Sequence, residues 1–149
     1  TTGFIAWQFA GGDDQIHVSM TTPTNIDWDN NVHYRVIWAA ASAGGATETF
    51  AFSVDEVAFG TAPATSAPTA FATVSDTAAS INVPLATAWA SANSSTTNGV
   101  TGTKDMVRLF VDCTTDSAND PRLIALEIKY LPKLTDGPQV NNQADPTDA

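Results

Sequence analysis

Two runs of alternating apolar and polar residues constrain the fold of this 149-residue chain more than any other feature. The first is MVRLFVDC at residues 106–113, and the second is RLIALEIKYLP at residues 122–132. An alternation of period two is typical of half-buried strands, because successive side chains point to opposite faces of a sheet. The intervening loop, TTDSANDP, is rich in turn formers. The block therefore predicts a long antiparallel hairpin that lies inside the sheets.

The alternation also assigns the inward side chains of this block. They are Val107, Leu109, Val111 and Cys113 in the first run, and Ile124, Leu126, Ile128 and Tyr130 in the second. Cys113 is the only cysteine of the chain, so a disulfide scaffold is excluded. Its place in an apolar stripe predicts a small buried side chain.

Six further segments have strand character, and none shows a period of 3.6. They are residues 2–10, 16–20, 32–40, 47–59, 69–74 and 80–89. A Gly-rich turn joins the third and fourth of these segments, which predicts a second hairpin. Pro84 places the last segment at a sheet edge or a bulge, because proline cannot donate to a ladder.

About eight short strands without a crossover helix predict an all-β fold, an antiparallel jelly-roll-like β-sandwich. An immunoglobulin-like sandwich is the alternative. The chain is long enough for one domain with its own core, which we assign to residues 1–132. Residues 133–149 contain only two large apolar side chains, so we expect a flexible acidic C-terminal tail.

The charge of the chain excludes several classes of partner. Sixteen acidic residues against six basic ones give a net charge of −10. Binding to nucleic acid requires Lys and Arg that neutralise phosphates, so we expect no nucleic-acid partner. We also expect no membrane partner, because no apolar run approaches the roughly 18 residues of a span and no signal peptide is recognisable.

The sequence contains no recognisable catalytic motif and no cofactor-binding motif. His17 and His33 fall on strand faces opposite the apolar stripes, and with Cys113 they show no metal-ligand spacing. We therefore predict that the protein is not an enzyme and has no catalytic, cofactor or metal site.

Three oxygen-rich clusters remain as weaker candidates for calcium. They are Asp13-Asp14, the pair Asp27 and Asp29, and the group Asp112, Asp116, Asn119 and Asp120. Such loops can supply some of the six to eight oxygens that calcium takes, but none matches the EF-hand template. Turn formation on a solvated edge is the preferred interpretation.

The four tryptophans divide into two groups. Trp7, Trp38 and Trp89 fit the inward faces of strands, so we predict core packing for them. The alternative is that the four tryptophans form a carbohydrate platform, since aromatic faces stack on sugars. Trp28 lies in a polar segment between strands and is the one tryptophan that we expect to contact something outside the protein.

Three stretches of the chain resemble jelly-roll structural proteins of tailed-bacteriophage virions. They are VHYRVIWAAASAGG with the following TETFAFSV, the block DMVRLFVDCTTDSANDPRLIALEIKYLP, and the Ala/Thr-rich acidic middle of the chain. The resembled proteins are trimeric capsid cement or decoration proteins and the domains of head or tail fibres. One departure is that the second block often carries an Arg after its first strand, where this chain has Asp112-Cys113.

The resemblance implies a non-enzymatic virion protein at the capsid surface. The expected role is that of a cement or decoration protein that binds the outer capsid surface and stabilises the head. The expected partners are the major capsid protein or another virion protein. The alternative is a fibre or a receptor- or glycan-binding module of the virion. We expect a homotrimer whose subunit contact uses the weakly charged middle segments 69–74 and 80–89.

Overall fold

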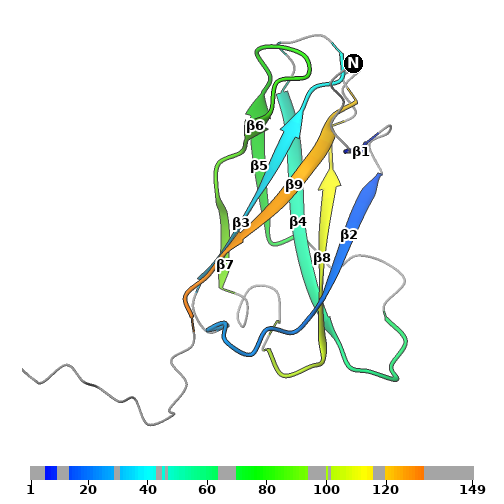
Figure 1. Cartoon of the computed structure of the whole chain (residues 1–149), viewed down its shortest axis with the longest axis vertical. Coiled ribbons are helices and arrows are strands. Elements are labelled where there is room, and N and C mark those ends of the chain that lie inside the picture. Colours follow the sequence, from blue (N-terminus) through cyan, green and yellow to red (C-terminus); the bar gives the residue numbers. More distant parts are fainter. Residues whose placement is uncertain are drawn as a thin grey trace, which may run out of the picture.

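The computed structural model describes residues 6–9, 14–28, 31–42, 45, 47–63, 70–93, 100, 102–115 and 120–132. Within these residues the chain forms nine strands in two facing antiparallel sheets and contains no helix (Figure 1). No segment among them is therefore a helix long and apolar enough to cross a membrane. The predicted all-β sandwich is confirmed. The predicted tail, residues 133–149, lies outside the described residues.

Each sheet has four or five strands. Sheet A contains, in spatial order, β1 (Trp7–Gln8), β9 (Arg122–Lys129), β3 (Asn31–Ala39) and β6 (Leu85–Ala86), with β7 (Ala90–Asn93) also paired to β3. Sheet B contains β2 (Gln15–Thr21), β8 (Met106–Cys113), β4 (Thr47–Val57) and β5 (Ala72–Thr77). The predicted segment 80–89 thus divides into β6 and the residues leading to β7, both at the edge of sheet A, as Pro84 indicated.

The strand order is that of a jelly roll. β6 and β7 pair with the same neighbour and are two pieces of one interrupted edge strand. With that strand counted once, the two sheets have the orders 1-8-3-6 and 2-7-4-5, in which the chain crosses repeatedly between the sheets. In an immunoglobulin-like sandwich the first two strands share a sheet, whereas β1 and β2 belong to opposite sheets here.

Both predicted hairpins are wrong. β8 pairs with β2 and β4, whereas β9 pairs with β1 and β3 in the other sheet. The strands β3 and β4 likewise lie in opposite sheets. Alternation determines which side chains of a strand point inward, but it carries no information on which strand lies beside it.

The core lies between the two sheets, and most of its large fully buried side chains come from β3 and β4. Its fully buried side chains include Val32, Tyr34, Val36 and Trp38 from β3 and Phe50, Phe52 and Val54 from β4. The ring centroids of Trp38 and Phe50 lie 5.5 Å apart, and those of Tyr34 and Phe52 lie 6.3 Å apart. The predicted inward stripe of β8 is confirmed, since Val107, Leu109, Val111 and Cys113 are all buried.

A bulge changes the predicted inward stripe of β9. Ile37 pairs with Ala125 and Trp38 pairs with Leu123, so Ile124 is the extra residue on β9. Leu123 is consequently buried in the place predicted for Ile124. Leu126 and Ile128 pack against the core as predicted, but Tyr130 lies beyond the strand and is exposed.

Gly102 allows a loop to close one end of the core. Its backbone has φ of 71°, and a methyl group at this position would lie 2.1 Å from Cδ1 of Trp28. The amide of Gly102 donates a hydrogen bond of 2.5 Å to Oε1 of Glu56 on β4. Only a residue without a side chain satisfies the close approach and the positive φ together.

We expect Gly102→Ala to destabilise the protein more than Gly60→Ala. Gly60 also has a positive φ, of 78°, but has no atom within 4 Å of an added methyl group. The control substitution therefore costs only the left-handed backbone penalty of about 1–2 kcal/mol. Gly102→Ala adds overpacking against Trp28, for a further loss of about 1–3 kcal/mol. Urea unfolding followed by tryptophan fluorescence measures both values, and equal losses would contradict the close approach.

Candidate functional surface

The structure reverses most of the tryptophan assignments. Trp38 is in the core as predicted, and its Nε1 donates a hydrogen bond of 2.9 Å to Oδ2 of Asp76. Trp7 and Trp89, predicted to be buried, are 71% and 37% exposed. Trp28, predicted to contact an outside partner, is only 8% exposed. The prediction for Trp7 fails because alternation does not show whether the opposite sheet extends far enough to cover a given side chain. The prediction for Trp89 fails because this residue lies between β6 and β7, outside a regular strand, so alternation does not determine its direction.

Trp89 belongs to a group of charged and aromatic side chains on the outer face of sheet A. The guanidinium carbon of Arg35 lies 4.4 Å from the centroid of the Trp89 ring, and Nζ of Lys129 lies 5.9 Å from it. Nε of Arg35 donates a hydrogen bond of 2.5 Å to Oε2 of Glu127. We call these four residues, together with His33, the Trp89 cluster.

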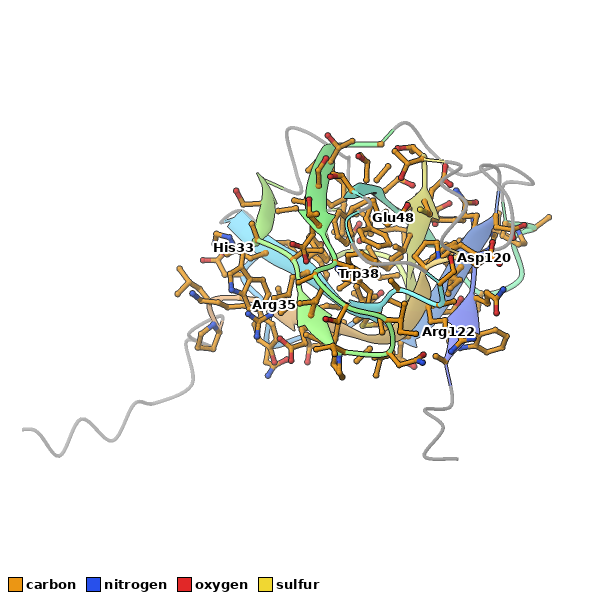
Figure 2. All side chains as sticks on the ribbon, turned by 90° about the horizontal axis from the view of Figure 1, so that it is seen from above. His33, Arg35, Trp38, Glu48, Asp120 and Arg122 are labelled. Carbon is orange, nitrogen blue, oxygen red and sulfur yellow. The ribbon has the colours of Figure 1, made fainter. Side chains whose placement is uncertain are left out.

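Strand pairing explains why these residues meet. β3 and β9 are adjacent, and their register places Arg35 opposite Glu127 and His33 opposite Lys129. All four alternate with inward residues, so they share the outer face of sheet A. Figure 2 shows His33 and Arg35 on the same side of the sandwich, away from Trp38 in the core.

The Trp89 cluster contributes little to folding. The side chains of Arg35 and Glu127 are 30% and 43% exposed, and an exposed ion pair is worth about 0–1 kcal/mol. A cation over an exposed aromatic ring adds about 0.5–1 kcal/mol. The main effect of the cluster is instead to place positive charge on the outer face of sheet A. Of the five Lys and Arg residues in the described part of the chain, Arg35, Arg122 and Lys129 lie on β3 and β9.

Two open hollows lie elsewhere on the surface. One, of about 430 Å³, is lined by Trp7 and by residues of β2 from Gln15 to Ser19. The other, of about 250 Å³, lies beside the turn after β4, where the ring of Phe59 is largely exposed. Beside it, Arg108 forms a two-pronged ion pair with Asp55, in which Nε and Oδ1 are 2.9 Å apart.

The structure keeps the histidines and the cysteine apart. His17 lies on the outer face of sheet B, where its ring packs edge-on against Phe110, with ring centroids 4.4 Å apart. His33 lies on the outer face of sheet A, and Cys113 points into the core. Both histidines are therefore on outer faces, as the sequence predicted.

The acidic groups of the sequence are only partly described. Asp13, Asp29, Asp116 and Asn119 lie outside the described residues. Asp120 accepts a hydrogen bond of 3.1 Å from Nε2 of Gln8. Among the residues that the structure describes, no group of three or more His, Cys, Asp and Glu side chains is arranged to hold a metal ion.

Two buried glutamates form a feature that the sequence analysis did not recognise. Glu48 and Glu56 lie on the inward face of β4, and both are buried. Oε2 of Glu48 accepts a hydrogen bond of 2.8 Å from Oγ1 of Thr115. The signal was available, because both glutamates have the same parity as Phe50 and Phe52.

Cys113 lies next to Glu48, with Sγ 3.7 Å from Oε2. Burial away from water raises the pKa of the Cys113 thiol to about 11, and the neighbouring Glu48 carboxylate acts in the same direction. The thiolate is the reactive form of cysteine, so this residue is protected by its surroundings as well as by its inaccessibility.

We expect Cys113 to react slowly with a thiol reagent at about pH 8, because little thiolate forms there in the folded protein. The rate should rise as the pH approaches the raised pKa, about 11. The free energy of unfolding should fall as the pH rises from 9.0 to about 11. In the unfolded chain the thiol has its ordinary pKa of 9.0 and loses its proton over this range, whereas the folded chain keeps the proton until the raised pKa, about 11, is reached. The chain unfolded in guanidinium chloride is the control, and equal rates in both states near pH 8 would contradict this assignment.

The strand order and the surface define a jelly-roll domain with a cation–aromatic cluster on one outer face. No protein-family model matches the chain. No curated protein matches it either.

The chain is similar in structure to two solved structures of a latent aurone synthase, a polyphenol oxidase co-crystallised with hexatungstotellurate(VI). The match to the first structure has a TM-score of 0.52 and 14% sequence identity, and it covers 80% of this chain and 24% of the synthase chain. The match to the second structure, whose crystal was also soaked in H₂O₂, has a TM-score of 0.50 and 11% sequence identity, and it covers 87% of this chain and 26% of the synthase chain. The chain spans about a quarter of that protein, and at this identity the likeness concerns the fold alone.

Proposed function

We propose that the protein is a non-enzymatic structural protein of a tailed-bacteriophage virion, which binds the outer capsid surface as a cement or decoration protein and stabilises the head. The proposal rests on the resemblance of its sequence to such proteins. The jelly-roll strand order supports it, because this is the fold that the resemblance implies. A fold alone does not determine a function, so the supporting surface must also be considered.

The observation that carries the proposal is a set of exposed apolar side chains beside the interrupted edge strand of sheet A. Ile81 and Val83 lie between β5 and β6, and about half of each side chain is exposed. β6 has only two residues and β7 has four, so they leave much of this edge without a regular strand. An incompletely covered edge with exposed apolar side chains favours contact with another chain.

The second candidate function is a fibre domain or a receptor- or glycan-binding module of a virion. The exposed Trp89 cluster favours it, because an aromatic ring flanked by hydrogen-bonding groups suits ligand recognition. Electron microscopy of virions labelled with an antibody against the chain separates the two functions. Label over the capsid lattice supports the cement role, and label on a fibre supports the alternative. Virions without label would contradict both.

We expect the purified protein to be a homotrimer, with Ile81 and Val83 in the subunit contact. Light scattering at micromolar concentration should give three times the chain mass of 15.6 kDa. The double variant Ile81→Lys, Val83→Lys should give the mass of one chain, because it places charges in an apolar contact. Phe59→Lys is the matched control, since Phe59 is also exposed but lies in the turn after β4.

A wild-type mass near 15.6 kDa would exclude a stable trimer. A trimer that survives the double variant but not Phe59→Lys would move the contact to the turn after β4. Either result leaves the capsid location to be decided by the antibody experiment.

A further inference from the structure

Among the described residues, Arg35 contacts a carboxylate with only one of its three guanidinium nitrogens. Its guanidinium is oriented by two contacts, the hydrogen bond from Nε to Glu127 and the ring of Trp89 beneath it. Among the described residues it makes no other hydrogen bond or ion pair. Within the described part of the chain, its two terminal nitrogens are thus left to donate to one anionic group in the two-pronged geometry that guanidinium favours.

Lys129 adds a second cation next to the same ring. It is exposed, its Nζ lies 5.9 Å from the ring centroid of Trp89, and it forms no ion pair with a described residue. Among the described residues of the cluster, Arg35 and Lys129 against Glu127 leave one net positive charge around the indole. This happens in a chain whose net charge is −10, so the positive site is local and contrasts with the rest of the molecule.

From this geometry we propose that the Trp89 cluster is a binding site for an anionic saccharide, one that carries carboxylate or sulfate groups. The acidic group pairs with Arg35 and Lys129. The apolar face of the sugar ring lies against the exposed part of Trp89, which is 37% accessible. The sugar hydroxyls donate to Glu127 and exchange hydrogen bonds with His33, which stands opposite Lys129 on the neighbouring strand.

The composition of the cluster favours a saccharide over a protein partner. The core of a protein–protein interface is depleted of charged residues and has a larger apolar area. Here a single aromatic ring is surrounded by two cations, a carboxylate and an imidazole. These side chains can form hydrogen bonds with several hydroxyl groups of a saccharide and an ion pair with one acidic group of it. The inference does not rest on the proposed capsid role, because either a cement protein or a fibre domain could bind such a ligand.

The test uses the full-length protein and three probes: oligogalacturonate for carboxylates, dextran sulfate for sulfates, and unmodified dextran as the neutral comparison. Binding is followed by tryptophan fluorescence and by calorimetry. We expect saturable binding of at least one anionic probe, with one site per chain, and no binding of dextran.

Variants locate the site. Trp89→Ala and Lys129→Gln should each weaken binding by about tenfold or more, since each removes one of the contacts just described. Trp7→Ala is the matched control for loss of an exposed tryptophan. Arg122→Gln is the matched control for loss of a cation from β9. Both controls should bind as the wild type does. Lys129 is exposed, so its variant tests the site without disturbing the core.

Several outcomes would overturn the proposal. Failure of both anionic probes to bind is one. Equal weakening by Arg122→Gln and Lys129→Gln would show diffuse attraction of a polyanion to the sheet face. Binding of poly-L-glutamate as tight as that of the saccharides, with the same dependence on Trp89 and Lys129, would assign the cluster to an acidic protein partner instead.

Discussion

The contact between the inner faces of β3 and β4 is the interaction on which the rest of the sandwich depends. Each of these strands has neighbours on both sides in its own sheet. They present fully buried aromatic side chains to one another, with Trp38 against Phe50 and Tyr34 against Phe52. Burial of one large apolar side chain contributes about 1.5–3 kcal/mol before the cost of ordering it is subtracted, so this contact provides a large part of the hydrophobic stabilisation of the core. The other strands pair with β3 and β4 directly or through a neighbour, so the contact between these two strands sets the distance between the sheets.

The same strand β4 also determines how the ends of the sandwich close. Its inward stripe runs from Glu48 through three apolar residues to Glu56, so a carboxylate is buried near each end. A buried carboxylate without hydrogen bonds is unfavourable by several kcal/mol. Thr115 donates to Glu48 at one end, and the amide of Gly102 donates to Glu56 at the other. Each glutamate therefore binds a residue of the chain that follows or precedes β8, and the lack of a side chain at Gly102 lets its backbone approach Trp28.

The sequence predicted the local features of the fold far better than the long-range ones. The bounds and inward stripe of residues 106–113 were predicted correctly, because period two reports directly on a strand whose alternate side chains enter the core, although Phe110 on the outer face is buried as well. The strands that pair with β8 were not predicted correctly, because in a jelly roll β8 and the next strand, β9, belong to opposite sheets. The prediction for Trp7 fails because its exposure depends on how far the facing sheet extends, and the prediction for Trp89 fails because the edge strand is interrupted at that point. The Trp89 cluster was beyond sequence reasoning, because it needs the register that brings Arg35 opposite Glu127.

The net charge of the chain does not govern what each of its faces can bind. Exposed charges are screened over about 8 Å at physiological ionic strength, a distance shorter than the roughly 10 Å between two packed sheets. The potential at Trp89 is therefore determined mainly by Arg35, Lys129 and Glu127, which lie next to it, and only weakly by acidic groups on the far sheet. Net charge still acts at longer range, because it slows the approach of a polyanion at low salt. An acidic protein of this kind should thus hold the acidic group of a saccharide locally, although its net charge slows the approach of that saccharide at low salt.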